Sequence, residues 1–80
     1  MRLPRDLSGA ELARRLERLG YVTSRQTGSH MRLTCASVQE HHLTVPRHDP
    51  LRIAALAAIL AGLAAAQGIS RDELLTPLFG

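Results

Sequence analysis

Two histidines follow turn-forming or strand-ending residues in the middle of the chain. His30 ends the run QTGSH (residues 26–30), where the glycine favours a tight turn. His48 ends the run VPRH (residues 45–48), where proline ends a strand-like segment. Histidine populates both protonation states near neutral pH, and arginine binds phosphate oxygens in bidentate fashion. Such a set suits metal-independent cleavage of RNA, in which the RNA's own 2′-hydroxyl is the nucleophile.

The sequence around each histidine favours this chemistry. Arg25 and Arg32 lie near His30, and Gly28 allows a phosphate to approach the backbone closely. His48 lies just before a predicted helix, whose N-terminus could hold a phosphate. On spacing alone both histidines also fit ordinary surface positions, so this alternative stays open.

Other chemistries fit the sequence less well. A zinc site is disfavoured because Cys35 is the only cysteine and no helical His-x3-His pair exists. A two-metal nuclease needs clustered carboxylates, whereas the seven acidic residues are scattered. Cys35 is predicted to be a buried hydrophobe, and Tyr21 a core residue. With one Tyr and one Phe, recognition by base stacking is disfavoured. We therefore expect neither a metal nor another cofactor.

Length and composition limit the class of protein. Eighty residues make one domain, and a chain this short buries only about 60% of its unfolded surface. A single cysteine permits no intramolecular disulfide and suits a reducing cytoplasm, and we expect no signal peptide. The longest apolar run, residues 53–66, is shorter than the roughly 20 residues of a membrane span. All ten basic residues are arginine, and the net charge is +4 over residues 1–52 against −1 over the rest. This basic front predicts an anionic partner, most often nucleic acid.

Three helices are predicted. SGAE (residues 8–11) forms a capping box, Leu12, Leu16 and Leu19 make an apolar stripe, and Gly20 ends the helix. The second helix is expected to start with Asp49 as N-cap and Pro50 at N1, and to end at Gly68. Its apolar stripe comprises Ile53, Leu56, Leu60 and Leu63, with Ile59 alongside. SRDE (residues 70–73) begins a short closing helix that carries Leu74, Leu75 and Leu78.

Three strands are predicted between the first two helices. Residues 21–26 form the first, Thr27-Gly28 a hairpin turn, residues 29–36 the second, and residues 41–45 the third, with a looser connection at 38–40. Strict alternation places Met31, Leu33, Cys35, Leu43 and Val45 inward. The same alternation gathers His30, Arg32, Thr34, His42 and Thr44 on one solvent-facing surface, while His41 packs at the sheet edge. The order predicts an α+β fold, a three-stranded antiparallel sheet with helices on one face.

Taken in order, these motifs resemble the HicA family of toxin–antitoxin systems. The family pattern joins Leu-x-x-x-Gly-Tyr/Phe, Arg-Gln-x-Gly-Ser-His and Val-Pro-x-His, which stand here at residues 16–21, 25–30 and 45–48. The resemblance runs from Leu12 to Leu75. It implies a double-stranded-RNA-binding-domain-like fold and a cytoplasmic mRNA interferase, an endoribonuclease that stops translation. It also implies a HicB-type antitoxin protein that covers the active face.

The resemblance assigns roles to particular residues. His30 is the implied catalytic acid or base, and candidates for support are His48, His42, Arg25 and Arg32. The expected RNA contacts are Arg25, Gln26, Gly28, Ser29, Arg32 and Arg47. This chain departs from many relatives at the start of the second helix, which has Ala54-Ala55 in place of Gly-Thr.

Two alternatives follow from these departures. Ala57, Ala58 and Ala61 stand where relatives carry basic residues, and fewer cations weaken phosphate binding. A non-catalytic double-stranded-RNA-binding module is one alternative. The other is an antitoxin-pairing module whose nuclease activity has degenerated.

Overall fold

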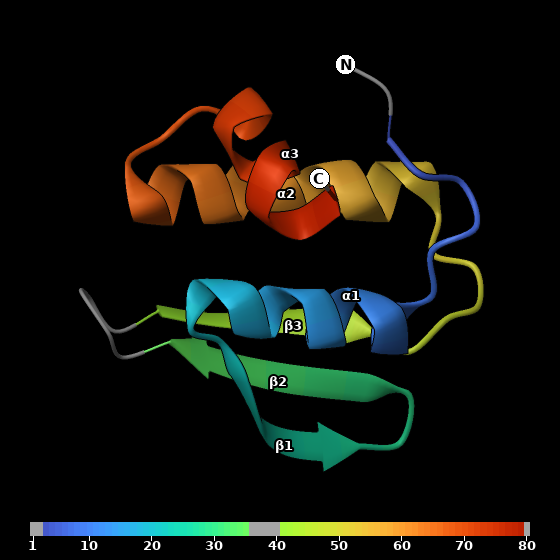
Figure 1. The fold of residues 1–80 in the computed structure, drawn as a ribbon. Helices are drawn as coiled ribbons and strands as arrows, with labels where there is room; N and C mark the ends of the chain where they lie inside the picture. The colour runs from blue at the N-terminus through green and yellow to red at the C-terminus, as the bar shows by residue number, and fades with distance from the viewer. Residues whose placement is uncertain (1–2, 36–40, 80) are drawn as a thin grey trace.

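The computed structural model describes residues 3–35 and 41–79 and confirms the predicted α+β architecture. The elements are, in order, α1 (Gly9–Leu16), the short 3-10 helix η1 (Glu17–Leu19), β1 (Val22–Thr27), β2 (His30–Cys35), β3 (His41–Pro46), α2 (Ile53–Gln67) and α3 (Arg71–Phe79). The strands form one antiparallel sheet in the order β1-β2-β3. Figure 1 shows β1 at the sheet edge farthest from α2 and α3. The predicted connection at residues 38–40 lies outside the described residues.

The first helix begins and ends as its sequence predicts. The Ser8 hydroxyl accepts a hydrogen bond from the backbone N–H of Glu11 at 3.0 Å, so one unpaired donor of the first turn is satisfied. Gly20 follows η1 with a φ of 90°, a conformation that favours glycine. Leu12 and Leu16 are fully buried, and Leu19 packs against the core. The stripe therefore fixes this helix onto the sheet.

The strands alternate as predicted, with a shift at the hairpin. Met31, Leu33, Cys35 and Val45 are buried, whereas their neighbours on the other face are exposed or half-buried. The hairpin turn comprises Gly28 and Ser29, not Thr27 and Gly28, because Thr27 pairs with His30 at the end of the ladder. Gly28 has a φ of 55°, as the first central residue of a two-residue hairpin turn requires.

The predicted start of the second helix is wrong. α2 begins at Ile53, its N-cap is Arg52, and no side chain caps it. Leu51 is buried, and its backbone N–H bonds to the carbonyl of Leu7 at 2.7 Å. The backbone of Arg52 is extended, with a φ of −68° and a ψ of 141°, so Asp49 and Pro50 precede the helix rather than start it. Ile53 is 43% exposed and does not join the buried stripe.

The rest of α2 and α3 follow the sequence prediction. Leu56, Leu60 and Leu63 are buried, and Gly68 ends α2 with a φ of 69°. Ser70 and Glu73 cap α3 reciprocally: each backbone N–H bonds to the other residue's side chain, at 3.0 and 3.1 Å. Over the described ranges no single helix meets the length and hydropathy expected of a membrane span. α2 and α3 meet them only as a pair bent by 106°.

The N-terminus of α1 lies directly against the end of β3. Gly9 is buried, and its backbone N–H bonds to the carbonyl of His48 at 2.8 Å. A Cβ at this position would overlap the carbonyl oxygen of Pro46 and lie 3.1 Å from the Cα of Arg47. The contact therefore requires glycine because of space, and it fixes where residues 46–48 run.

We expect Gly9→Ala to destabilise the fold by about 2–4 kcal/mol, since backbone must move to make room. Gly62→Ala is the matched control. Gly62 lies within α2 with nothing within 4 Å of an added Cβ, so alanine there should stabilise by about 0.5–1 kcal/mol. Urea unfolding followed by circular dichroism measures both. Equal effects of the two substitutions would contradict the close approach at Gly9.

Tyr21 and His41 form a polar contact at the end of the sheet opposite the β1–β2 turn. The hydroxyl of the fully buried Tyr21 lies 2.7 Å from Nδ1 of His41 and also accepts a weaker hydrogen bond from Gln67 at 3.5 Å. The two rings meet edge to face at 5.8 Å. His41 is half-buried on β3, an edge strand, as predicted. Burial raises the pKa of Tyr21, because it disfavours the phenolate.

Because Tyr21 is the only tyrosine, its ionisation can be followed by absorbance. We expect the pKa of Tyr21 in the folded protein to lie above its ordinary value of 10.0. The stability from this group is then fully present below pH 10 and is lost as the pH rises through the raised pKa. In denaturant the midpoint should return to the ordinary value. A folded-state midpoint at or below the denatured one would contradict the buried hydroxyl.

Candidate functional site

The sheet face that the helices leave uncovered, here called the open face, carries the polar side chains of all three strands. Register and alternation place Arg25, His30, Arg32, His42 and Thr44 there. The strands contain no acidic residue, and the basic side chains that they carry are arginine and histidine. The open face therefore carries basic side chains and no acidic side chain from these strands.

Two arginines lie directly opposite each other in the middle of the open face. Arg25 of β1 and Arg32 of β2 are paired across the ladder, and both are exposed. Like charges directly opposite each other destabilise a sheet. The ion pairs within the described residues all involve Glu11 on α1, so none neutralises this pair. An anionic ligand held between the two guanidinium groups would remove the repulsion.

His30 lies at the turn end of the same face. It begins β2, pairs with Thr27 on one side and with Pro46 on the other, and is exposed. Arg32 is two residues further along β2, a separation of about 7 Å. Long side chains reach across such a distance. One phosphodiester could therefore contact the imidazole and a guanidinium group together.

The second histidine motif of the sequence, residues 45–48, meets the first at this end. The backbone N–H of Arg47 bonds to the carbonyl of Ser29 in the β1–β2 turn at 2.6 Å. The His48 carbonyl accepts from Gly9 in the first turn of α1, and its side chain is exposed. His48 thus lies beside α1, not at the start of α2 as the sequence suggested. Both histidines belong to one end of the sheet.

His42 shares the open face with His30 but lies at the other end of it. It pairs with Thr34, four residues along β2 from His30, which is about 13 Å. Its Nδ1 lies 2.9 Å from the Thr34 hydroxyl, which in turn lies 2.9 Å from that of Ser24. The structure therefore does not bring His42 to the phosphate that His30 would contact.

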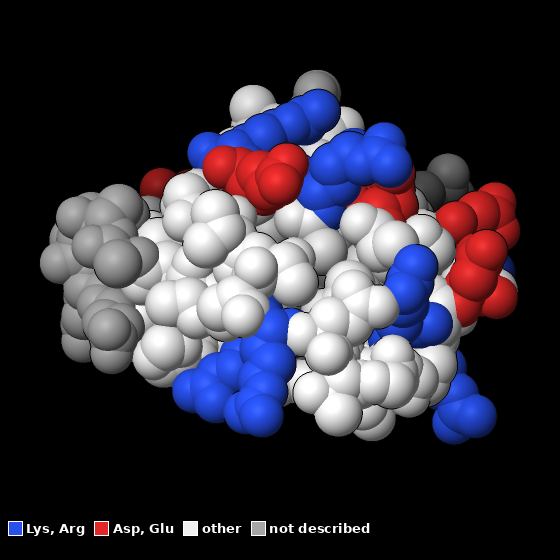
Figure 2. Space-filling view, turned by 90° about the horizontal axis from the view of Figure 1, so that it is seen from below, with Lys and Arg blue, Asp and Glu red and all other residues white. Residues whose placement is uncertain are grey.

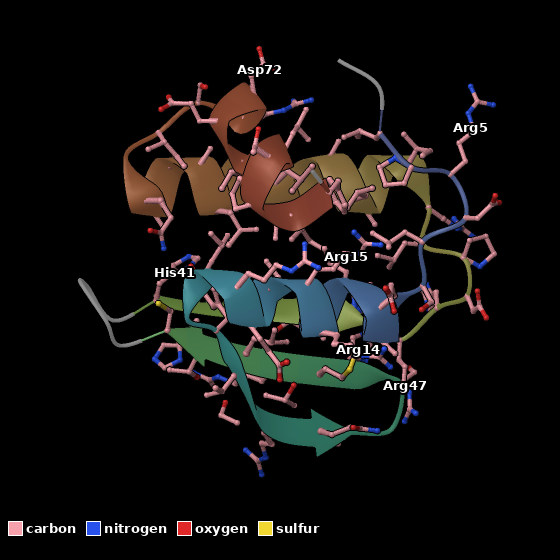
Figure 3. The ribbon with its side chains drawn as sticks, in the orientation of Figure 1. Arg5, Arg14, Arg15, His41, Arg47 and Asp72 are labelled. Atoms are coloured by element: carbon pink, nitrogen blue, oxygen red, sulfur yellow. The ribbon has the colours of Figure 1, made fainter. Side chains whose placement is uncertain are left out.

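Two of the expected RNA contacts lie on the opposite side of the sheet. Gln26 pairs with the buried Met31, so it faces the helices. Arg47 lines the same hollow as Gln26, beside Arg14 of α1. Figure 3 shows Arg14 and Arg47 near one another and His41 at the far end of β3. Gly28 and Ser29 form the turn between β1 and β2, at the edge of both faces of the sheet.

Arg15 of α1 and Arg18 of η1 are engaged within the protein. Arg15 donates to the carbonyl of Leu78 at 2.9 Å and lies 5.4 Å from the ring centre of Phe79. Arg18 donates to the carbonyls of Pro77 and Leu78 at 3.2 and 3.4 Å. Both cap the C-terminal end of α3, where cations are stabilising. These two arginines are thus less available to an external phosphate than the arginines of the open face are.

Basic side chains differ in their surroundings on the molecular surface (Figure 2). Figure 2, viewed from below relative to Figure 1, shows acidic side chains near some of the basic ones, with other basic groups surrounded by uncharged surface. Over the described ranges, no three His, Cys, Asp or Glu side chains converge as a metal site would require.

Fold and face together define a small α+β domain with a cationic, histidine-bearing open sheet. Residues 9–66 match the family model described as HicA toxin of bacterial toxin-antitoxin. This range is well over half of the chain, and the protein belongs to the HicA toxin family. It is therefore the toxin of a toxin–antitoxin system, with an antitoxin as its partner. The family match ends before α3 (Arg71–Phe79). No curated protein and no solved structure matches the chain significantly.

Sequence reasoning missed three features of this region. The close approach at Gly9 left no signal beyond a glycine in a helix start. The Ser24 hydroxyl joins Thr34 because β1 shifts register between Thr23 and Arg25, and a period of two cannot reveal such an irregularity. The hydrogen bonds from Arg18 to the last carbonyls of α3 depend on packing between segments that lie far apart in the chain.

Removing one member of the Arg25–Arg32 pair should change the stability of the fold and its affinity for RNA in opposite directions. We expect Arg32→Gln to raise the free energy of unfolding by about 0.5 kcal/mol, because it relieves like-charge repulsion. The same change should weaken binding of a 2′-O-methyl RNA. It should also reduce the dependence of affinity on salt. The slope of the logarithm of the binding constant against the logarithm of the salt concentration should fall in magnitude by about 0.7 for each phosphate that the protein no longer neutralises. Arg71→Gln, on α3, is the control.

Thermal unfolding and fluorescence anisotropy at several salt concentrations measure the two effects. A loss of stability in Arg32→Gln, or RNA affinity equal to that of Arg71→Gln, would contradict the anion site.

Proposed function

We propose that the protein is a metal-independent endoribonuclease that cleaves mRNA in the cytoplasm and thereby stops translation, with His30 as acid or base. The observation that carries this proposal is the placement of His30 next to an unneutralised arginine pair on an open face without acidic residues. Family membership supports it, since the chain is a toxin of the HicA family.

The reaction would use the RNA's 2′-hydroxyl as nucleophile. A base removes the 2′-proton while the 2′-oxygen bonds to the adjacent phosphorus, and the bond from phosphorus to the 5′-oxygen breaks. An acid then gives the leaving 5′-oxygen its proton. The products are a 2′,3′-cyclic phosphate and a 5′-hydroxyl. Arg25 and Arg32 would stabilise the negative charge of the five-coordinate phosphorus.

His48 is the better candidate for the second proton-transfer group. Its backbone is held beside the β1–β2 turn that precedes His30, whereas His42 lies about 13 Å along the sheet. We assign His42 and Thr34 no part in the proton transfers. The RNA would lie along the open face, with Gly28 and Ser29 at its edge.

A double-stranded-RNA-binding module that reads RNA through α1 is less well supported. Arg15 and Arg18 are bonded to α3, and Arg14 lies 3.8 Å from Glu11. α2 carries no charged residue from Ile53 to Gln67, so it offers phosphate no side-chain cation. Less RNA affinity is therefore expected on α1 and α2 than on the open face.

His30→Ala should abolish cleavage of a defined RNA in EDTA, by about 10²- to 10⁴-fold, while RNA binding persists. His48→Ala should slow cleavage, and His42→Gln should remain within a few-fold of the unchanged protein. End analysis should find 2′,3′-cyclic phosphates.

Three results would contradict this account. Products with 5′-phosphates that require a divalent metal would indicate different chemistry. Cleavage by His30→Ala equal to that of the unchanged protein would remove His30 from the reaction. No cleavage by the unchanged protein, with normal antitoxin pairing, would identify a toxin whose nuclease activity has degenerated.

A further inference from the structure

β1 is an exposed edge strand that runs beside a groove. All six residues from Val22 to Thr27 are exposed, including Thr23 and Gln26 on the helix side. β1 is the outermost strand, so within the described part of the chain its outer backbone edge has no strand partner. Such an edge is a template for another extended chain.

The groove lies between α1 and β1 and has a volume of about 270 Å³. Ala13 and Met31, both buried, contribute apolar surface. Its charged lining residues are Arg14, Arg47 and Glu17. A groove between a helix and an edge strand is the geometry in which extended peptides add a strand to a sheet.

We infer that β1 and this groove bind an extended, acidic segment of the antitoxin protein as an added strand. Alternate side chains of an added strand point to opposite sides. On one side they would meet Arg25, and on the other they would enter the groove near Arg14 and Arg47. Acidic side chains on the partner strand would therefore face arginine on both sides of the sheet.

The chemistry of the strand disfavours other occupants. A second copy of this chain would bring a strand with an arginine and no acidic residue against an identical one. A nucleic acid backbone presents repeated phosphates and does not match the alternating donors and acceptors of a strand edge. The register shift at Ser24 limits regular pairing to a short stretch, Arg25 to Thr27. An irregularity of this kind limits indiscriminate pairing of an exposed edge strand.

This inference rests on the family assignment and not on the nuclease chemistry. Hydrogen–deuterium exchange on the full-length toxin, alone and co-purified with its antitoxin, tests it directly. Amides of residues 25–27, where regular pairing is expected, should exchange at least tenfold more slowly in the complex. Unchanged exchange of these amides would overturn the inference.

A charge-reversal pair of variants provides the second test. Arg14→Glu should weaken antitoxin binding on the order of tenfold, because it places a negative charge in the groove. Arg71→Glu has the same charge change on α3 and should bind like the unchanged protein. Arg14 takes no part in the proposed cleavage, so RNA cleavage should be equal in the two variants.

Three outcomes of these tests would overturn the inference. Equal antitoxin affinity of the two variants would exclude the groove from the interface. Loss of RNA cleavage in Arg14→Glu with antitoxin binding intact would assign the groove to RNA. Dimerisation of the free toxin with protection of residues 25–27 would assign the edge of β1 to a second copy.

Discussion

The position of residues 46–48 determines how the histidine-bearing end of the sheet is built. On one side Arg47 donates its backbone N–H to the carbonyl of Ser29 in the β1–β2 turn, and on the other His48 accepts from Gly9 of α1. Only glycine leaves space for this contact with Pro46. The first turn of α1, the hairpin turn before His30 and the end of β3 are thereby fixed relative to one another. These backbone contacts therefore set the geometry of any site that includes His30 and its neighbours.

The ten arginines serve different purposes according to the element that carries them. Arg15 of α1 and Arg18 of η1 bond to the last carbonyls of α3, which lies beyond the family match. Arg25 and Arg32 of the sheet face each other without a carboxylate between them. Internal pairing of Arg15 and Arg18 stabilises the fold, whereas for Arg25 and Arg32 we propose that an anionic ligand supplies the opposite charge. Net charge alone could not distinguish these two uses.

Most of the fold could be predicted from the sequence because its signals are local. The Ser8 and Ser70 caps, the alternation of β2 and the leucines of α2 each follow from periods and cap chemistry within a few residues. The start of α2 could not be predicted, since the bond from Leu51 to Leu7 joins segments far apart in the chain. For the candidate site, the motifs predicted His30 as a site residue, and strand alternation predicted the open face on which it lies. The separation of His42 from His30, and the placement of Gln26 on the helix side, required the strand register.

The central claim is that RNA lies on the open sheet face and not on α1. The most direct measurement is NMR of the His30→Ala protein, following the arginine side-chain Nε–H signals as a single-stranded RNA is added. The account predicts shifts for Arg25 and Arg32, with Arg15 and Arg18 unchanged because α3 already holds them. Shifts at Arg15 and Arg18 with Arg25 and Arg32 unaffected would contradict it.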